Sequence, residues 1–398
     1  MFHHDQSAVL KESVPGPQAC RGAGRRIGLI VLGAAVLAVG PSAWAQEAKV
    51  PNWDAMRKAG IVSIDRNTTQ RWLDAQIQKL LALEDAKAAQ KDGTAFYKTM
   101  MREFTAGDAA QPYKDRLADL LAASFANNYQ PAAAAKPPRP LAVSLVLMAL
   151  RDFAHPSAQP CFRAALNDPA PGPRFMAADG LLAIRQALTD QDWAALVPLL
   201  QKAAAQETNN PTLSRIYSVL FAAGVNNNRV QNVIAAIMTA LDNRCQTYEQ
   251  KGLLPLKADG EALAWVADRA ERGNDAAARL GATRRAARVL ADAVYAYLNE
   301  KPDKEQLGEL EELIIQSETR LEGLARVVNR NVKLPDPTVR AAMLAGGPER
   351  IKTMEAARDQ WVGSGQAPGV LNAAPFDFPV GLGIKRPMPA TSTAAAGG

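Results

Sequence analysis

The stretch CFRAALNDPAPGPRFMAADGLLAI, residues 161–184, shows the plan of the chain more plainly than any other segment. Apolar residues at helical spacing lead into a short turn, and a second series of apolar residues at helical spacing follows it. The turn contains three prolines, and each proline lacks an amide hydrogen and restricts the residue before it. The stretch therefore predicts two helices joined by a tight turn.

The same pattern continues on both sides of this turn, where six helices are expected to pair into three hairpins. Arg174 and Arg215 each open a hairpin and stand 41 residues apart, while Pro160 and Pro198 lie near the start of second helices and stand 38 apart. A period near 40 is typical of helical-repeat proteins, in which each hairpin buries its apolar face against its neighbours. The expected helices cover residues 141–153, 157–167, 174–187, 191–206, 212–224 and 229–243.

The central turn also resembles the turn of HEAT repeat proteins. The matching positions are Leu166, Asp168, Pro169, Arg174, Ala177 and Leu181. A second, weaker copy has Asn209 in the aspartate position and Arg215 in the arginine position, so a regular ladder of buried aspartates is not expected. The resemblance covers residues 141–243. It implies a short α-solenoid, and because the concave face of such repeats often binds other proteins, it also implies a scaffold or binding role.

The first residues of the chain have the pattern of a secretory signal peptide. Basic residues up to Arg26 precede the apolar run 27–39, and Ala43 and Ala45 form a small-residue cleavage site before Gln46. The run is shorter than the roughly 20 residues that span a bilayer, so no stable membrane span is expected after processing. We therefore expect an exported protein, periplasmic or extracellular; an uncleaved anchor is the alternative.

The rest of the sequence predicts an all-α protein. Its composition is rich in alanine and only 6% aromatic, which favours close helix packing over strands. The expected fold is a short α-solenoid of helical hairpins with an N-terminal helical unit and a long C-terminal helical hairpin. The expected segments are a signal peptide (1–45), an N-terminal helical unit (46–129) with an irregular lead-in (46–64), a Pro/Ala-rich linker (130–140), HEAT-like hairpins (141–243), a C-terminal hairpin region (244–361) that begins loosely (244–260), and a disordered tail (362–398).

The C-terminal hairpin is expected from two apolar seams of period 3.5 that are separated by a short turn. Pro302 ends the first helix, and Asp303 caps the second with help from Gln306. The first helix is basic and the second acidic, which favours an antiparallel pair within one chain. A homo-oligomer formed through residues 278–332 is the alternative.

Few residues remain that suggest chemistry. Without the leader, His155 is the only histidine, and its place in a turn beside a proline predicts a capping role. Cys161 and Cys245 are expected about two helix layers apart, farther than the roughly 7 Å that a disulfide allows, although a disulfide stays open. No phosphate-binding, hydrolase or zinc-protease motif occurs, so we predict no cofactor, no metal site and no catalytic residues.

The charge balance also narrows the class of partner. Removing residues 1–45 leaves 42 basic and 38 acidic residues, a net charge of +4 with mixed signs, which does not favour nucleic acid. The sequence thus predicts an exported, non-enzymatic protein-binding or scaffolding protein whose protein partner it does not identify. The alternatives are an extracytoplasmic α/α enzyme acting on a polysaccharide or peptide, and a structural component that assembles through its coiled-coil-like helices.

Overall fold

The computed structural model describes residues 48–59, 63–129, 139–251, 253–365 and 367–382. These residues form fifteen α-helices and two short 3-10 helices and contain no strand. The N-terminal helices are α1 (Trp53–Ala59), α2 (Ser63–Leu81), α3 (Ala86–Thr105) and α4 (Gln111–Asn128). The central elements are α5 (Pro140–Phe153), η1 (Pro156–Ala158), α6 (Gln159–Ala165), α7 (Pro171–Ala183), α8 (Asp190–Gln206), α9 (Asn210–Ala223) and α10 (Asn227–Lys251). The C-terminal elements are α11 (Lys257–Arg272), α12 (Ala276–Asn299), α13 (Lys304–Val328), α14 (Val339–Ala345), α15 (Arg350–Val362) and η2 (Val370–Asn372).

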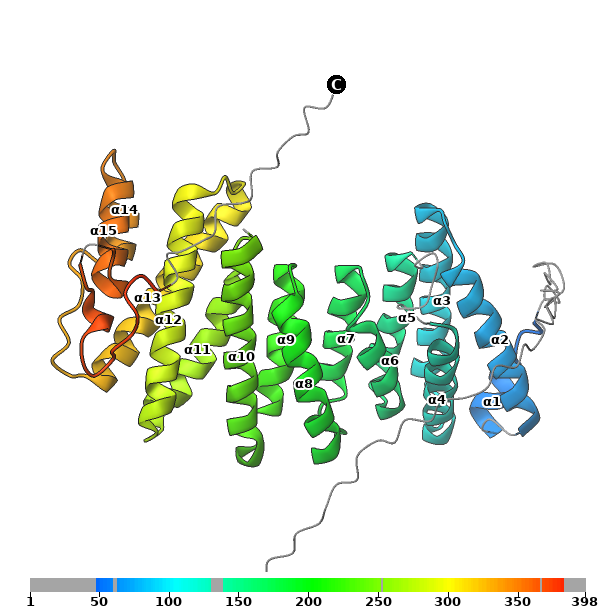
Figure 1. The fold of residues 1–398 in the computed structure, drawn as a ribbon. Helices are drawn as coiled ribbons and strands as arrows, with labels where there is room; N and C mark the ends of the chain where they lie inside the picture. The colour runs from blue at the N-terminus through cyan, green and yellow to red at the C-terminus, as the bar shows by residue number, and fades with distance from the viewer. Residues whose placement is uncertain (1–47, 60–62, 130–138, 252, 366, 383–398) are drawn as a thin grey trace, which may run out of the picture. The chain divides into compact units, whose positions relative to one another are not determined.

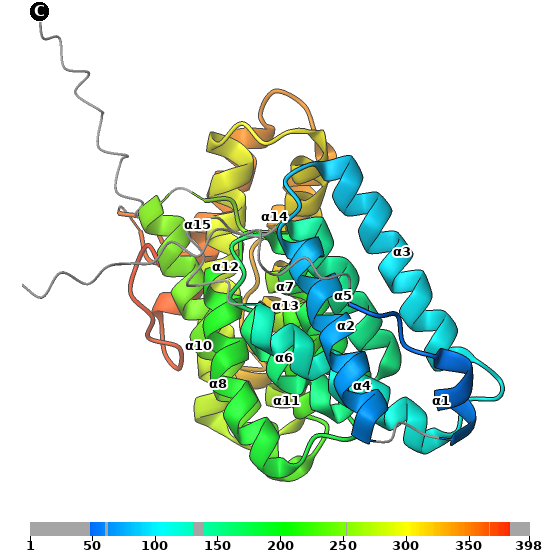
Figure 2. The ribbon, with the colours of Figure 1, turned by 90° about the vertical axis from the view of Figure 1, so that its right-hand side faces the viewer.

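The helices stack side by side in chain order as two layers (Figure 1). One layer consists of α3, α5, α7, α9, α11 and α13, each packed against the next. In the other layer α4 contacts α6, and α8, α10, α12 and α15 follow one another. Figure 2, which looks from the side of α1–α4, shows α3 on one side and α8 and α10 on the other. This is the α-solenoid arrangement expected from the sequence, because each hairpin buries its apolar side against its neighbours.

The six central helices form where the sequence predicted them, and local caps explain their ends. Prolines stand in the first turns of α5, α7 and α9, where no intrahelical amide is needed. Thr189 and Asp192 form a capping box that starts α8, and Pro198 lies inside that helix. Gly180 allows α7 to approach α6 closely, because a Cβ at this position would overlap the Phe162 ring.

Both cysteines of the described residues are buried and free. The Cys161 thiol lies 3.2 Å from the Ala122 carbonyl oxygen, and burial raises the pKa of this thiol to about 12. Burial also raises the pKa of Cys245 well above its ordinary value. The expectation of two separate thiols is confirmed, because the first lies in α6 and the second in α10.

The expected C-terminal hairpin is formed by α12 and α13, which pack along each other. Asp303 and Gln306 make the predicted capping box at the start of α13. Seam residues such as Leu290, Val294 and Leu321 are buried within the chain. In addition, α12 packs against α10, α11 and α15, so its apolar surface is divided among several neighbours.

Three expected segments differ from the structure. The lead-in 46–64 contains α1, which is ordered because Trp53 and Met56 are buried and Trp53 packs edge-on against Trp72. The stretch expected to be loose, 244–260, is mostly helical, with α10 reaching Lys251 and α11 beginning at Lys257. The expectation of a disordered tail does not hold for residues 363–365 and 367–382.

In residues 363–382, Leu371 and Phe376 are buried in the core, and η2 contacts α15. The average composition of the tail did not indicate this ordered segment, because composition does not show where individual apolar side chains such as Leu371 and Phe376 are buried. None of the helices in the described ranges combines the length and the apolar composition that a membrane span needs. The linker residues 130–138 and the last residues 383–398 lie outside the described part of the chain.

Candidate functional site

Asp168, the centre of the predicted repeat turn, is buried between α6 and α7. One of its carboxylate oxygens accepts a hydrogen bond from the Ala170 amide at 2.7 Å, which closes the turn before α7. The other accepts a hydrogen bond from the Tyr129 hydroxyl, just after α4. Burial and this carboxylate raise the pKa of Tyr129. Asp168 therefore links the turn between α6 and α7 to the end of α4 through Tyr129.

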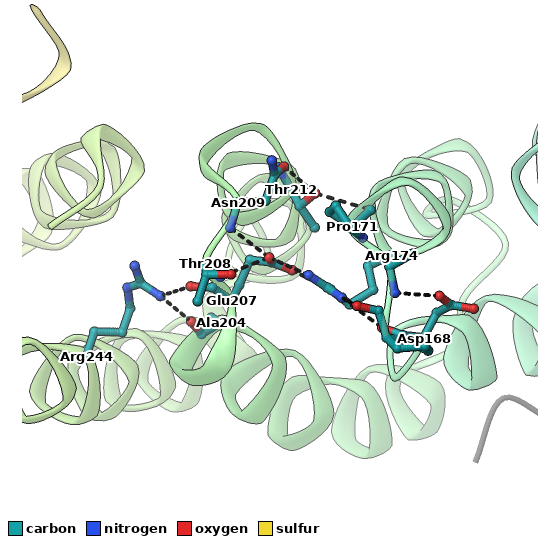
Figure 3. Close-up of polar contacts among 11 residues, drawn as sticks. Asp168, Pro171, Arg174, Ala204, Glu207, Thr208, Asn209, Thr212 and Arg244 are labelled. Carbon is teal, nitrogen blue, oxygen red and sulfur yellow. Dashed lines mark hydrogen bonds and ion pairs between the residues drawn. The ribbon is translucent and has the colours of Figure 1, made fainter. Parts of the chain in front are cut away.

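Arg174 does not bond to the Asp168 side chain but joins two successive turns (Figure 3). Its Nη1 donates to the backbone carbonyls of Asp168 and Pro169, both at 2.8 Å. Its Nε and Nη2 donate to the two carboxylate oxygens of Glu207 at 2.6 and 2.7 Å. This paired geometry is the strong form of the arginine–carboxylate interaction, and the bonds to Glu207 raise the pKa of Arg174.

Glu207, which the sequence did not indicate, is the centre of the next turn. Its side chain is 1% exposed and also accepts hydrogen bonds from the backbone amides of Thr208 (2.9 Å) and Asn209 (2.8 Å) (Figure 3). Asn209 caps α9 by accepting the Thr212 amide at 3.1 Å. Glu207 stands 39 residues after Asp168, close to the repeat period near 40, and this spacing is the one signal in the sequence that could have indicated it.

Arg215 lies away from this turn and does not repeat the contacts of Arg174. Its Nε is 3.4 Å from the Asp179 carboxylate, and its guanidinium lies 5.4 Å from the centroid of the Phe175 ring. Arg174 is the fourth residue of α7, whereas Arg215 is the sixth of α9. Two extra residues rotate a side chain by about 200° around the helix, so Arg215 faces a different neighbour.

A buried ion pair at 2.6 Å joins Arg244, inside α10, to Asp259, in the first helical turn of α11. Arg244 also donates to the carbonyls of Ala204 (3.0 Å) and Glu207, and thus binds the preceding turn. The Tyr217 and Tyr248 hydroxyls both donate to Asp259. Burial disfavours the charged guanidinium, yet the negative charge of Asp259 outweighs this effect and raises the pKa of Arg244.

These residues form a turn network, defined as Asp168, Arg174, Glu207, Arg244 and Asp259. Its carboxylates accept hydrogen bonds from arginines, tyrosines and backbone amides, so their lone pairs are engaged within the protein. The turn network therefore holds hairpins together and does not present a free general base.

Two clefts lie on either side of Glu207 in the described part of the chain. The larger has a volume of about 620 Å³ and is lined by Arg244, Tyr248 and Lys251, with Leu253 and Leu256 on its apolar side. The smaller, about 340 Å³, lies beside Asp168 and Arg174. The wall between them is shared, since residues 206–208 line both.

His155 takes the structural place predicted for it. Its side chain caps η1 by accepting the Ser157 amide, and its ring nitrogens lie 3.6 and 3.9 Å from the carboxylates of Asp119 and Asp115. Over the residues that the structure describes, no group of three histidine, cysteine, aspartate or glutamate side chains is placed to hold a metal ion.

A second feature is the odd-helix face, the outer side of α5, α7, α9, α11 and α13. Its residues are all partly exposed: Arg151, Phe175, Asp179, Arg215, Phe221, Glu261, Trp265, Asp268, Arg269 and Arg320. Polar contacts connect each helix to the next: Arg151 to Asp179 (2.9 Å), Arg215 to Asp179 (3.4 Å), Ser214 to Glu261 (2.7 Å) and Arg320 to Asp268 (2.7 Å). The face therefore combines aromatic rings and arginines on a firmly connected surface.

No protein-family model, curated protein or solved structure matches this chain. The helical-repeat arrangement is nevertheless established by the packing of the helices themselves. The predicted cleavage-site residues Ala43, Ala45 and Gln46 lie outside the described residues.

Proposed function

We propose that this chain is an exported, non-enzymatic protein-binding scaffold built from HEAT-type repeats. The observation that carries the proposal is the odd-helix face, where partly exposed aromatic and arginine side chains lie on consecutive helices. Tryptophan, tyrosine and arginine dominate the binding energy of protein interfaces. A surface of this composition fits a macromolecular partner better than a small substrate.

The connections across the odd-helix face support the same proposal. Asp179 of α7 lies between Arg151 of α5 and Arg215 of α9, at 2.9 and 3.4 Å. Such pairs hold the side chains in place before a partner arrives, and a preorganised surface loses less conformational entropy on binding. The partly exposed Phe175 ring, 5.4 Å from the Arg215 guanidinium, lies beside these pairs and offers an apolar contact to a partner.

The HEAT assignment rests on the turn at Asp168. Its carboxylate closes the turn, and Arg174 six residues later bonds to the turn's own carbonyl groups. Export rests on the leader sequence that ends at Ala45. N-terminal sequencing of the protein recovered from the host's envelope fraction tests the second point, and we expect the first residue to be Gln46. An intact leader on the recovered protein would contradict it.

The binding role is tested by capturing partners from an envelope extract on the immobilised mature chain. The double variant Phe175→Ser, Arg215→Glu removes an aromatic ring and reverses a charge on the odd-helix face. Lys202→Glu, which reverses the charge of an exposed lysine on α8, serves as the matched control. We expect a partner that binds the wild type and the control but not the double variant. No stable partner, together with turnover on a panel of glycans and peptides, would favour the α/α enzyme instead.

Self-assembly through residues 278–332 is a separate possibility that the sequence raised. The seam residues are already buried within the chain, which favours a monomer. Light scattering on the mature chain decides between the two, because a concentration-dependent dimer would support self-assembly.

A further inference from the structure

An aromatic and cationic stack joins α9 to α11 on the odd-helix face. The rings of Phe221 and Trp265 are stacked, with centroids 5.2 Å apart and planes inclined by 11°. The Arg269 guanidinium lies 3.4 Å from the centroid of the Trp265 ring. Phe221, Trp265 and Arg269 are named here the α9–α11 stack.

The end of α9 is shaped to receive this stack. Gly224 follows α9, and a Cβ there would approach the Trp265 ring to 2.6 Å, so glycine allows the indole to lie against the helix end. The next residue, Val225, is 78% exposed. An apolar side chain open to solvent therefore follows directly in sequence on the glycine against which the partly exposed indole lies.

Arg269 differs from the other arginines of the odd-helix face in having no carboxylate partner among the described residues. Arg151, Arg215 and Arg320 each pair with an aspartate of a neighbouring helix. Arg269 makes one hydrogen bond, to its own helix carbonyl at Trp265, at 3.1 Å. A guanidinium has five N–H donors, so most of its donor capacity is uncommitted.

The stacking fixes this guanidinium in place at some cost in hydration. Its position against the indole removes water from one face, and burial lowers the pKa of Arg269 below its ordinary value. A partly desolvated cation without a counter-charge gains more from an incoming carboxylate than a fully hydrated one. The planar guanidinium also matches a carboxylate with two parallel hydrogen bonds.

We propose that the α9–α11 stack anchors a segment of the protein partner that carries one carboxylate next to an apolar residue, an inference that rests on the proposed function. A carboxylate of the partner accepts hydrogen bonds from Arg269, and an apolar side chain next to it packs on Val225 and Trp265. Neighbouring acids argue against a polyanion such as nucleic acid, because Asp268 and Glu271 flank Arg269 on α11. One cation beside an apolar surface fits an isolated carboxylate next to an apolar residue.

The experiment selects a phage-displayed library of random 12-residue peptides on the mature chain. We expect selected peptides to carry Asp or Glu next to Leu, Ile or Phe. The affinity of a labelled selected peptide should fall at least about tenfold in Arg269→Gln. Arg269→Lys should not restore it, because an ammonium group lacks the planar pair of donors. Arg284→Gln, an exposed arginine of α12, is the matched control and should leave affinity unchanged.

Three results would overturn the inference: selected peptides that are basic or uncharged, selected peptides that bind Arg269→Gln as well as wild type, or no selected peptide at all. Thermal unfolding followed by circular dichroism confirms that each variant is folded. Capture from envelope extract separates the two proposals. A captured partner that binds wild type and Arg269→Gln equally would contradict the role of Arg269 as a carboxylate anchor but support the binding function. The absence of any captured partner would contradict the binding function itself.

Discussion

The most direct test of the turn network is Glu207→Gln, which removes one charge and keeps the shape of the side chain. The Glu207 carboxylate accepts four hydrogen bonds, two from Arg174 and one each from the amides of Thr208 and Asn209. Glutamine keeps one acceptor oxygen, and its amide group would point N–H donors at other donors. The two backbone amides and Arg174 Nη2 all bond to one oxygen, Oε1, which the glutamine oxygen can replace. The variant therefore leaves Arg174 without its counter-charge, and the glutamine NH₂ group faces the Arg174 Nε donor that bonded to Oε2.

The expected cost follows from the burial of the two partners. Removing one member of a buried ion pair costs about 3 to 5 kcal/mol. The Glu207 side chain is 1% exposed, but the Arg174 side chain is 16% exposed and keeps its two bonds to the carbonyls of Asp168 and Pro169. Because water and these carbonyls still solvate the guanidinium, we expect the lower end, about 3 kcal/mol.

Urea unfolding of residues 46–398, followed by circular dichroism at pH 7, measures this loss. Native-state hydrogen exchange at the Thr208 and Asn209 amides measures it locally, and both amides should lose protection. In a double-mutant cycle, Arg174→Met combined with Glu207→Gln should cost less than the sum of the single changes, by about 1 to 3 kcal/mol. A loss below about 1 kcal/mol in Glu207→Gln, or strictly additive single changes, would refute the network as the joint between hairpins.

Three further predictions concern other buried groups. Burial raises the pKa of Glu318 above 4.5, so the folded state binds this proton more tightly than the unfolded chain, and the free energy of unfolding falls as pH rises from 4.5 through the raised pKa. Glu318→Gln should remove this dependence, which urea midpoints between about pH 4 and 7 will show; an unchanged pH profile would contradict it. The thiols of Cys161 and Cys245 should not react with a thiol reagent in the native protein, and both should titrate in denaturant. The loss of both thiols in denaturant would mean that they are bonded to each other. Gly180→Ala should lower the free energy of unfolding by about 1 to 3 kcal/mol because the new methyl group would overlap Phe162, and an unchanged urea midpoint would show that the ring moves aside freely.

The sequence predicted the helices well where local signals coincide. Prolines, caps and apolar spacing around Asp168 act within a few residues, so the six central helices and the hairpin turn at Asp303 were accessible to sequence reasoning. The short helix α1 was not, because its stability comes from Trp53 packing on Trp72, a contact made by tertiary structure. The ordered segment around Leu371 was missed for the same reason.

The turn network shows more sharply what one sequence leaves out. The motif match put Asn209 in the position of the aspartate, but the carboxylate that occupies this second turn is Glu207, two residues earlier. An acid in a turn is normally exposed, and the burial of Glu207 becomes favourable only because Arg174, at the start of the hairpin that Glu207 follows, bonds to it. Arg244 and Asp259 likewise stabilise each other across a stretch whose local pattern is weak. Such pairs of residues are brought together by the stacking of the hairpins. The repeat period indicates that the hairpins stack but does not specify which side chains meet.

The turn network also determines how the stack responds to load. Arg174 of α7 bonds to Glu207 before α9, and the Glu207 carbonyl accepts a hydrogen bond from Arg244 of α10, which bonds in turn to Asp259 of α11. We call each of these polar contacts between helices a joint. Each joint shares a residue or a backbone group with the next, so the joints are connected in series. Tension on this edge passes through every joint, and the weakest one sets the stiffness of the whole. We expect the solenoid to bend most easily between hairpins that no such polar contact joins. When a partner binds two distant hairpins, the compliance between its two contact points is the sum of the compliances of all the joints in between.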